Sequence, residues 1–167
     1  MGSGKTTIGK LLAQKLCLNF VDTDHIIEIQ QGMTVAEIFE RHGEAAFREM
    51  EHKLLLELQN GDSAIIATGG GMPCYNDNMN IMLACGKVVY LKTSPQELVR
   101  RLILSNSERP LINGKTKTEL LQYITEELSK RTPVYSRANI SVETDSFPIE
   151  EMIVHAITYS ISFQTVR

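Results

Sequence analysis

The stretch Gly2-Ser3-Gly4-Lys5-Thr6-Thr7 leads directly into a run with apolar residues at helical spacing, namely Ile8, Leu11, Leu12 and Leu16. Gly-Lys-Thr at the start of a helix is the second half of a phosphate-binding loop, in which backbone N–H groups and the helix N-terminus hold phosphate oxygens. In such a loop Lys5 reaches the β- and γ-phosphates, and the Thr6 hydroxyl is a ligand of Mg²⁺. The stretch therefore predicts a nucleotide-using enzyme.

The match to the complete pattern G-x-x-x-x-G-K-[ST] is partial, because its first glycine would precede Met1. Two interpretations stay open at this point. One is a surface helix that happens to begin with glycine and lysine, and the other is a P-loop without its front end. The rest of the chain has to distinguish them.

Composition places the chain in a broad class. Its 167 residues fit one domain, and 43% hydrophobic with 22% charged residues is ordinary for a globular protein. The net charge of −3 gives no general attraction to nucleic acid or to an anionic membrane. We see no apolar run of membrane-spanning length and no signal peptide, which predicts a cytoplasmic protein. Three cysteines are too few for a disulfide framework or a zinc site.

Helical and extended patterns alternate along the chain, which predicts an α/β domain with a parallel sheet. We expect strands at 19–22, 64–68, 87–91 and 140–143, the second of them covered on both faces because it is continuously apolar. Thr34 and Glu37 form a capping box, Gly43 ends that helix, and Pro133 ends the helix that begins at Glu119. Further helices are expected at 6–16, 26–31, 44–59, 76–85, from Pro95 onward, and at 149–163, with a long polar loop at 105–117.

Acids and glycines follow two of the predicted strands, where parallel sheets bind ligands. Asp22 and Asp24, two residues apart on an extended segment, point to the same side, so one can attend Mg²⁺ while the other faces a substrate hydroxyl. A solvated turn is the competing interpretation. Gly69-Gly70-Gly71 permits close approach of a ligand to the backbone, although a tight turn would use the same residues.

Three arginines stand in suggestive places. Arg48 lies beside the predicted core residues Phe47 and Met50, Arg109 lies in the long polar loop, and Arg131 precedes Pro133. Each can hold an anion bidentately, and each can equally be an ordinary surface charge. Taken singly, none decides the function.

Taken together and in this order, the motifs closely resemble shikimate kinase. They are Gly2-x-Gly4-Lys5-Thr6, Asp22-Thr23-Asp24, Phe47-Arg48-x-x-Glu51, Thr68-Gly69-Gly70-Gly71, Arg109-Pro110-Leu111 and Arg131-x-Pro133-x-Tyr135. The combination distinguishes the chain from adenylate kinases and gluconate kinase. The resemblance, which runs from Met1 to about Pro148, implies a three-layer α/β/α P-loop kinase fold with a parallel sheet. It implies a single domain over 1–167, with a shikimate-binding region at about 24–52 and a lid at about 105–118.

The resemblance also implies an activity, the transfer of the ATP γ-phosphate to the 3-hydroxyl of shikimate. The residues Gly2, Ser3, Gly4, Lys5, Thr6 and Thr7 would bind the ATP phosphates, with Lys5 on the transferring group. Thr6 and Asp22 would hold Mg²⁺, and Arg109 would close over the phosphates. The implied ligands are shikimate and ATP, with no nucleic-acid or membrane partner, and the implied state is a monomer.

On the shikimate side, the resemblance assigns roles to a second set of residues. Asp24 would bind the ring hydroxyls and accept the proton of the attacking one. Arg48 and Arg131 would hold the carboxylate. Gly69, Gly70 and Gly71 would meet a ring hydroxyl through backbone N–H groups.

The sequence departs from the family in one respect that affects the fold. Shikimate kinases have a strand and the first P-loop glycine ahead of the position of Met1, and that strand lies mid-sheet, between the strands that begin here at Ala64 and Lys87. We expect these two strands to face an open slot, and we favour a start upstream of Met1. The alternatives are a shortened protein that binds shikimate without turnover and a P-loop kinase of another small hydroxy acid. The segment 142–148, where the family binds adenine, is short and lacks an arginine.

Overall fold

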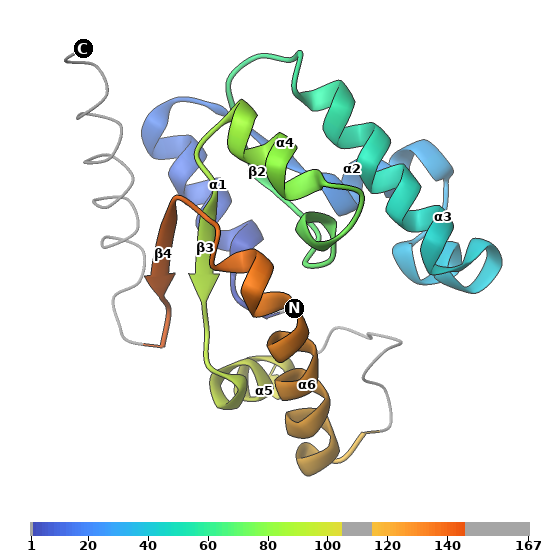
Figure 1. Cartoon of the computed structure of the whole chain (residues 1–167), viewed down its shortest axis with the longest axis vertical. Coiled ribbons are helices and arrows are strands. Elements are labelled where there is room, and N and C mark those ends of the chain that lie inside the picture. Colours follow the sequence, from blue (N-terminus) through green and yellow to red (C-terminus); the bar gives the residue numbers. More distant parts are fainter. Residues whose placement is uncertain (1, 105–114, 146–167) are drawn as a thin grey trace.

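A computed structural model of the chain describes residues 2–104 and 115–145, drawn in colour in Figure 1. Helices and strands alternate, as the sequence predicts. The elements are α1 (Lys5–Leu16), β1 (Asn19–Asp22), α2 (Thr23–Gln31), α3 (Val35–Leu58), β2 (Ala64–Ala67), the 3₁₀ turn η1 (Met72–Cys74), α4 (Asn78–Cys85), β3 (Val89–Lys92), α5 (Pro95–Leu104), α6 (Lys117–Tyr135) and β4 (Ile140–Glu143). No helix among these described residues is both long and apolar enough to cross a membrane.

The four strands form two parallel pairs. β1 pairs with β2, with Asn19 opposite Ala64, and β3 pairs with β4, with Val89 opposite Ile140. Among the described strands none pairs with both β2 and β3, so the sheet is divided between them. This division is at the position where the family resemblance places a central strand. The expectation that β2 is covered on both faces is wrong: Ile65 packs in the core, whereas Ile66, which points to the opposite face, is 39% exposed.

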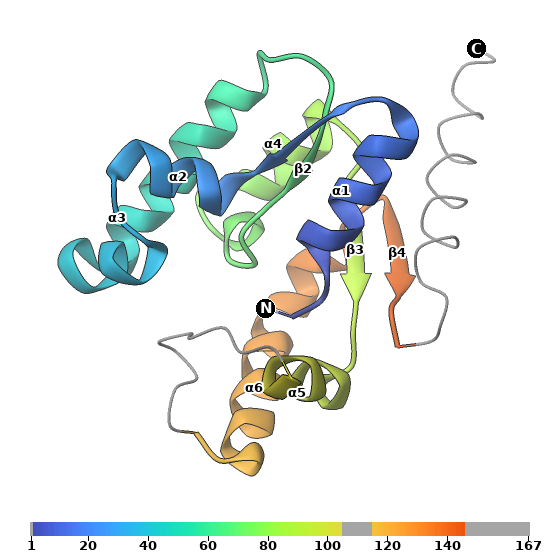
Figure 2. The same ribbon diagram turned by 180° about the vertical axis from the view of Figure 1, so that it is seen from behind.

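Helix α1 packs against both pairs of strands. Leu12 on α1 and Val142 on β4 are buried in one cluster, against which apolar residues of α1 and of all the strands except β1 pack: Ile8, Leu16, Ile65, Val89, Leu91 and Ile140. Contact with β1 is close as well, because a β-carbon on Gly9 would come within 2.7 Å of the Phe20 ring. Figure 2 shows α1 in front of the strands, whereas α4 and α6 lie on the opposite side in Figure 1, so the strands form the middle of three layers.

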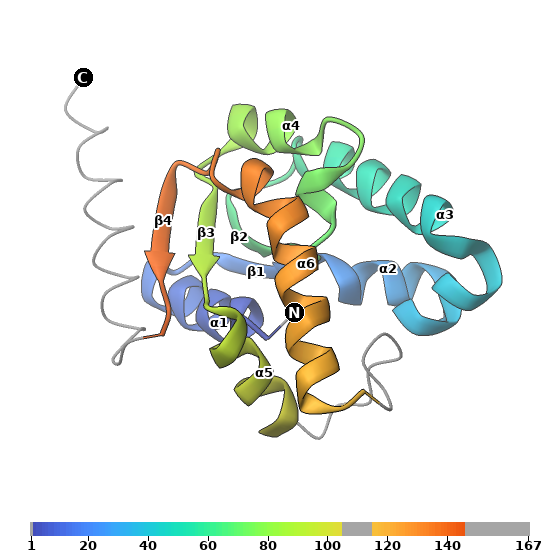
Figure 3. The same ribbon diagram turned by 60° about the horizontal axis from the view of Figure 1, so that its bottom comes forward.

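Two further clusters hold the helices that flank the strands. Ile27 on α2 packs with Ile38, Phe47 and Leu54 on α3, and α5 packs on α6 through Leu98, Leu102 and Leu120. The capping box at Thr34 is present, and the backbone leaves helical geometry at Gly43 (φ 78°), so the predicted break between two helices is confirmed as a kink within α3. Figure 3 shows α6 crossing in front of β1, β2 and the start of α2, which brings its C-terminal half toward the site described below.

Two predicted helix boundaries are wrong. Helix α2 begins at Thr23 instead of Ile26, so Asp24 lies in its first turn and not on an extended segment. Carboxylates are favourable there because the backbone N–H groups of a first turn are unpaired. Helix α6 continues past Pro133 to Tyr135, because so close to the C-terminus a proline removes only one of the last helical hydrogen bonds. The predicted helix at 149–163 and most of the predicted lid lie outside the described residues.

Candidate active site

The P-loop residues have the backbone geometry that anion binding needs. Gly2 and Gly4 both have positive φ angles, 71° and 88°, and Gly4 is the N-cap of α1. The Nζ of Lys5 lies 3.5 Å from the hydroxyl oxygen of Ser3, and Thr6 Oγ1 donates to Asp22 Oδ2 at 2.9 Å. The open N-terminus of α1, a cation and a hydroxyl paired with a carboxylate therefore fit a phosphate with its Mg²⁺.

Protein side chains alone would not hold this metal in the described part of the chain. Within residues 2–104 and 115–145, no three His, Cys, Asp or Glu side chains are grouped to bind an ion. Mg²⁺ commonly takes only one or two protein ligands and completes its shell with water and substrate phosphates. Thr6 and Asp22 are consistent with that kind of site.

Two carboxyl groups, of the buried Glu51 and the half-buried Asp24, converge on Gly69 in the loop that follows β2. Oδ1 of Asp24 and Oε1 of Glu51 are both buried without a hydrogen-bond partner among the described residues, and both lie within 2.7 Å of where a β-carbon of Gly69 would be. The Gly69 N–H donates to Thr23 Oγ1 at 3.1 Å, which fixes the loop to the start of α2. Burial raises the pKa of both carboxyl groups, and the charge of Asp22 raises that of Asp24 further.

Arg48 is held at Gly71, two residues further along the same loop. Its guanidinium atoms Nη1, Cζ and Nη2 would all lie within 2.6 Å of a β-carbon on Gly71, so a side chain at this position would displace the guanidinium. Nη1 donates to Glu51 Oε2 at 2.7 Å, and Nη2 and Nε donate to Glu44 Oε1 at 2.7 and 3.2 Å. Both acids lie on α3 within one turn of Arg48, a spacing that brings side chains together.

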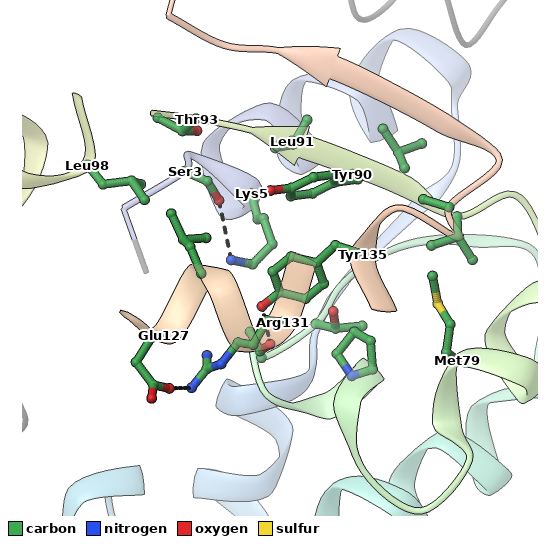
Figure 4. A pocket seen from close by; sticks show the side chains of 18 of the residues that line it. Ser3, Lys5, Met79, Tyr90, Leu91, Thr93, Leu98, Glu127, Arg131 and Tyr135 are labelled. Carbon is green, nitrogen blue, oxygen red and sulfur yellow. Dashed lines mark hydrogen bonds and ion pairs between the residues drawn. The ribbon is translucent and has the colours of Figure 1, made fainter. Parts of the chain in front are cut away.

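Arg131 approaches the same glycine loop from α6. Arg131 and Tyr135 line a pocket that Ser3 and Lys5 line as well; in Figure 4 the Tyr135 ring lies near Lys5, and the Arg131 side chain extends toward Glu127. The hydroxyl of Tyr135 donates to the carbonyl of Gly70 at 2.5 Å, and Arg131 pairs with Glu127 one turn away. The remaining lining is mainly apolar and comes from α4, β3 and α6, including Met79, Tyr90 and Ile124.

The predicted site residues other than Arg109 thus lie at one end of the strands. Lys5 and Asp24 are close enough to interact electrostatically, as are Glu51 and Arg131, and Gly69 lies against both carboxyl groups. Arg109 lies outside the described residues. Asp22 and Asp24 lie close together, as the sequence predicts. The reason is that β1 ends at Asp22 and α2 begins at Thr23, and not that side chains alternate along an extended segment.

Sequence reasoning gave no role to several residues that shape this site. Glu44, Glu51 and Tyr75 surround the Arg48 guanidinium, and the spacings of the two acids from Arg48 on a predicted helix were the available signal. Arg101 on α5 donates to the carbonyl of Thr144 at 2.6 Å and to that of Ser3 at 3.4 Å, so it connects the P-loop to the end of β4. Nothing local in the sequence indicated this second contact, which joins residues 98 positions apart.

Comparison with known proteins gives a consistent result. A family model for shikimate kinase matches residues 1–162. Shikimate kinase of Parabacteroides distasonis is 43% identical over 162 residues, which are 97% of this chain and 91% of that protein. The crystal structure of shikimate kinase from Bacteroides thetaiotaomicron superposes with a TM-score of 0.91 at 39% identity and covers 97% of this chain and 94% of its own. A structure of the Acinetobacter baumannii enzyme in complex with shikimate has a TM-score of 0.85 at 33% identity, covering 100% of this chain and 91% of its own.

Proposed function

The chain belongs to the shikimate kinase family, and on that premise we propose that it transfers the γ-phosphoryl group of ATP to the 3-hydroxyl of shikimate, forming shikimate 3-phosphate and ADP. It is thus a phosphotransferase with an alcohol as acceptor. The observation that carries this assignment is the convergence of Asp24, Arg48 and the Gly69–Gly71 backbone within reach of a P-loop. We further propose that the protein acts as a monomer.

On the nucleotide side, the positive-φ glycines and the start of α1 hold the phosphates. Lys5 follows the negative charge of the transferring group, since its Nζ already lies on the P-loop side of the pocket. Thr6 and Asp22 hold Mg²⁺, which when bound neutralises phosphate charge. The chain's contribution is positioning and electrostatic stabilisation, and a covalent intermediate is not required.

On the acceptor side, Asp24 orients the 3-hydroxyl and accepts its proton as the oxygen attacks. Burial makes it a stronger base than an exposed aspartate, because its raised pKa reflects a carboxylate that water solvates poorly. Arg48 and Arg131 bind the substrate carboxylate, and Tyr135 fixes Gly70 so that neighbouring backbone groups meet a ring hydroxyl. Arg109, which the family resemblance implies would close over the phosphates, lies outside the described residues.

The test is a coupled assay of ADP formation with and without shikimate. We expect ATP consumption that depends on shikimate, a fall of about 10²- to 10⁴-fold in kcat for Asp24→Asn, and weakened shikimate binding for Arg48→Ala. Glu49→Gln is the matched control, since Glu49 is exposed on the same helix and accepts a hydrogen bond from Asn76. Shikimate binding without turnover would assign a binding protein instead, and turnover of a different hydroxy acid would replace the substrate.

A further inference from the structure

The edge of Arg48 that suits a carboxylate is already occupied. A guanidinium binds a carboxylate best through two adjacent N–H groups, and here Nε and Nη2 both donate to Glu44 Oε1, at 3.2 and 2.7 Å. The other side of the group, Nη1, is taken by Glu51 at 2.7 Å. A substrate carboxylate can therefore bind the paired edge formed by Nε and Nη2 only if Glu44 moves, and it can bind the edge formed by Nη1 and Nη2 only beside both acids.

The two acids differ in how readily they can move. The side chain of Glu51 is 1% exposed and is fixed against Gly69, whereas that of Glu44 is 53% exposed at the rim of a surface hollow. Moving Glu44 into water keeps its charge solvated, but Glu51 would have to leave the interior. Glu44 is therefore the displaceable partner.

Glu44 is nevertheless well held in the free protein. The hydroxyl of Tyr75 donates to the same Oε1 at 3.1 Å, and the Tyr75 ring lies 4.5 Å from the guanidinium carbon of Arg48. The hydrogen bond from Arg48 lowers the pKa of Glu44, and the charge of Arg131 lowers it too. Glu44 is thus an anion in the field of both arginines that are proposed to bind the substrate carboxylate.

We propose that Glu44 is a built-in competitor for the substrate carboxylate: it occupies the paired edge of Arg48 in the free protein and is displaced when shikimate binds. The inference deepens the proposed function and rests on it. Its consequence is selectivity. A ligand without a negative charge has little to gain from displacing Glu44, whereas a carboxylate replaces one ion pair with another.

The first test compares Glu44→Gln with the wild-type chain by calorimetric titration of shikimate and of its uncharged methyl ester. Removing the competitor's charge should lower the dissociation constant of shikimate about three- to tenfold. The ester should be affected much less. Glu49→Gln is the matched control, because Glu49 lines the same hollow but accepts its hydrogen bond from Asn76 and not from Arg48. An equal gain in Glu49→Gln would mean simple charge repulsion and would overturn the proposal.

A second variant tests the same point without changing charge. Tyr75→Phe keeps the ring against Arg48 but removes the hydroxyl that holds Glu44, so we expect a smaller gain in shikimate affinity. If Glu44 only positions Arg48, both variants weaken binding, which would overturn the proposal. Arg48→Ala distinguishes a failure of the competitor proposal from a failure of the proposed function. Shikimate binding that is lost in Arg48→Ala but not tightened in Glu44→Gln contradicts the competitor alone, and no binding by wild type or Glu44→Gln contradicts the proposed function as well.

Discussion

At the scale of single residues, the chemistry depends on where burial and charge place each carboxyl group. Asp24 and Glu51 face Gly69 with oxygens that have no hydrogen-bond partner in the described part of the chain, and both have raised pKa values because the interior disfavours their charged forms. Asp22, by contrast, accepts a hydrogen bond from the exposed Thr6 hydroxyl. Neighbouring acids thus have environments suited to different tasks, proton acceptance for Asp24 and metal binding for Asp22.

The raised pKa of Asp24 predicts the acid side of the pH profile. A base works only when deprotonated, so kcat/KM should fall as the pH drops through the pKa of Asp24 in the free protein. Because burial and Asp22 raise that pKa, the midpoint should lie above the ordinary value of 3.8. Steady-state rates measured from acid to neutral pH check this, and Asp24→Asn should lose this limb of the profile. A midpoint at or below 3.8 would contradict the assignment.

A second residue-scale prediction concerns Gly71. Gly71→Ala would place a β-carbon within 2.6 Å of three guanidinium atoms of Arg48, so the arginine must shift. We expect shikimate affinity to fall about 10- to 100-fold, since misplaced binding groups lose most of their interaction, while nucleotide affinity is retained. Titration calorimetry with each ligand measures both. Gly86→Ala is the control, because no atom of residues 2–104 and 115–145 lies within 4 Å of its β-carbon position, and equal effects of the two changes would contradict this prediction.

At the scale of elements, the residue at which a helix begins decides which of its side chains face the site. Thr116 caps α6 by accepting from Glu119 N, and the Glu119 side chain accepts from Thr116 N in return. The helix then carries Glu127, Arg131 and Tyr135 along the face that meets the glycine loop. The cap therefore contributes to the placement of groups four and five turns away.

Thr116→Ala should remove this cap. We expect the free energy of unfolding to fall by about 1 kcal/mol, because backbone N–H groups of the first turn lose their side-chain acceptor. Urea denaturation followed by circular dichroism measures the change. Thr118→Ala, an exposed threonine inside the same helix, is the control and should have little effect. Equal losses in both variants would indicate a general intolerance of α6 to alanine and not a cap.

Elements with strong local signals were predictable, and those decided by distant contacts were not. The start of a helix at Pro95, the Thr34–Glu37 box and the break at Gly43 follow from local chemistry and are confirmed. Helix α2 begins three residues earlier than predicted because Thr23 and Asp24 are held against Gly69, 45 or more positions away. Likewise, the family resemblance implied a place for Arg48 at the substrate, whereas only the helical spacing of Glu44 and Glu51 indicated which acids hold it.

At the scale of the whole molecule, α1 joins two separate pairs of strands. Its Leu12 is buried with Val142 of β4, and Ile65 of β2 packs against the same cluster. The described strands β2 and β3 do not pair with each other, so their association depends on such side-chain contacts instead of a shared ladder of hydrogen bonds. The stability of the domain should accordingly be sensitive to the α1 core.

Leu12→Ala tests this dependence. Truncating a leucine that is 5% exposed should lower the free energy of unfolding by about 2–5 kcal/mol, through lost apolar burial and the cavity left behind. Chemical denaturation monitored by circular dichroism gives the value. Leu104→Ala, at a leucine that is 68% exposed, is the control and should change it by less than about 0.5 kcal/mol. Similar values for both would show that α1 does not join the two pairs.

The position of the P-loop at the start of α1 links ligand binding to the integrity of the domain. Anything that seats on Gly4 and Thr6 is bound by the same helix that joins the two halves, so it binds only when both are in place. By mass action, a nucleotide at 100 times its dissociation constant would add about 2.7 kcal/mol to the resistance against unfolding. Bound nucleotide would then stabilise the association of the two pairs of strands as well as donate phosphate, and protection from proteolysis would rise with nucleotide concentration.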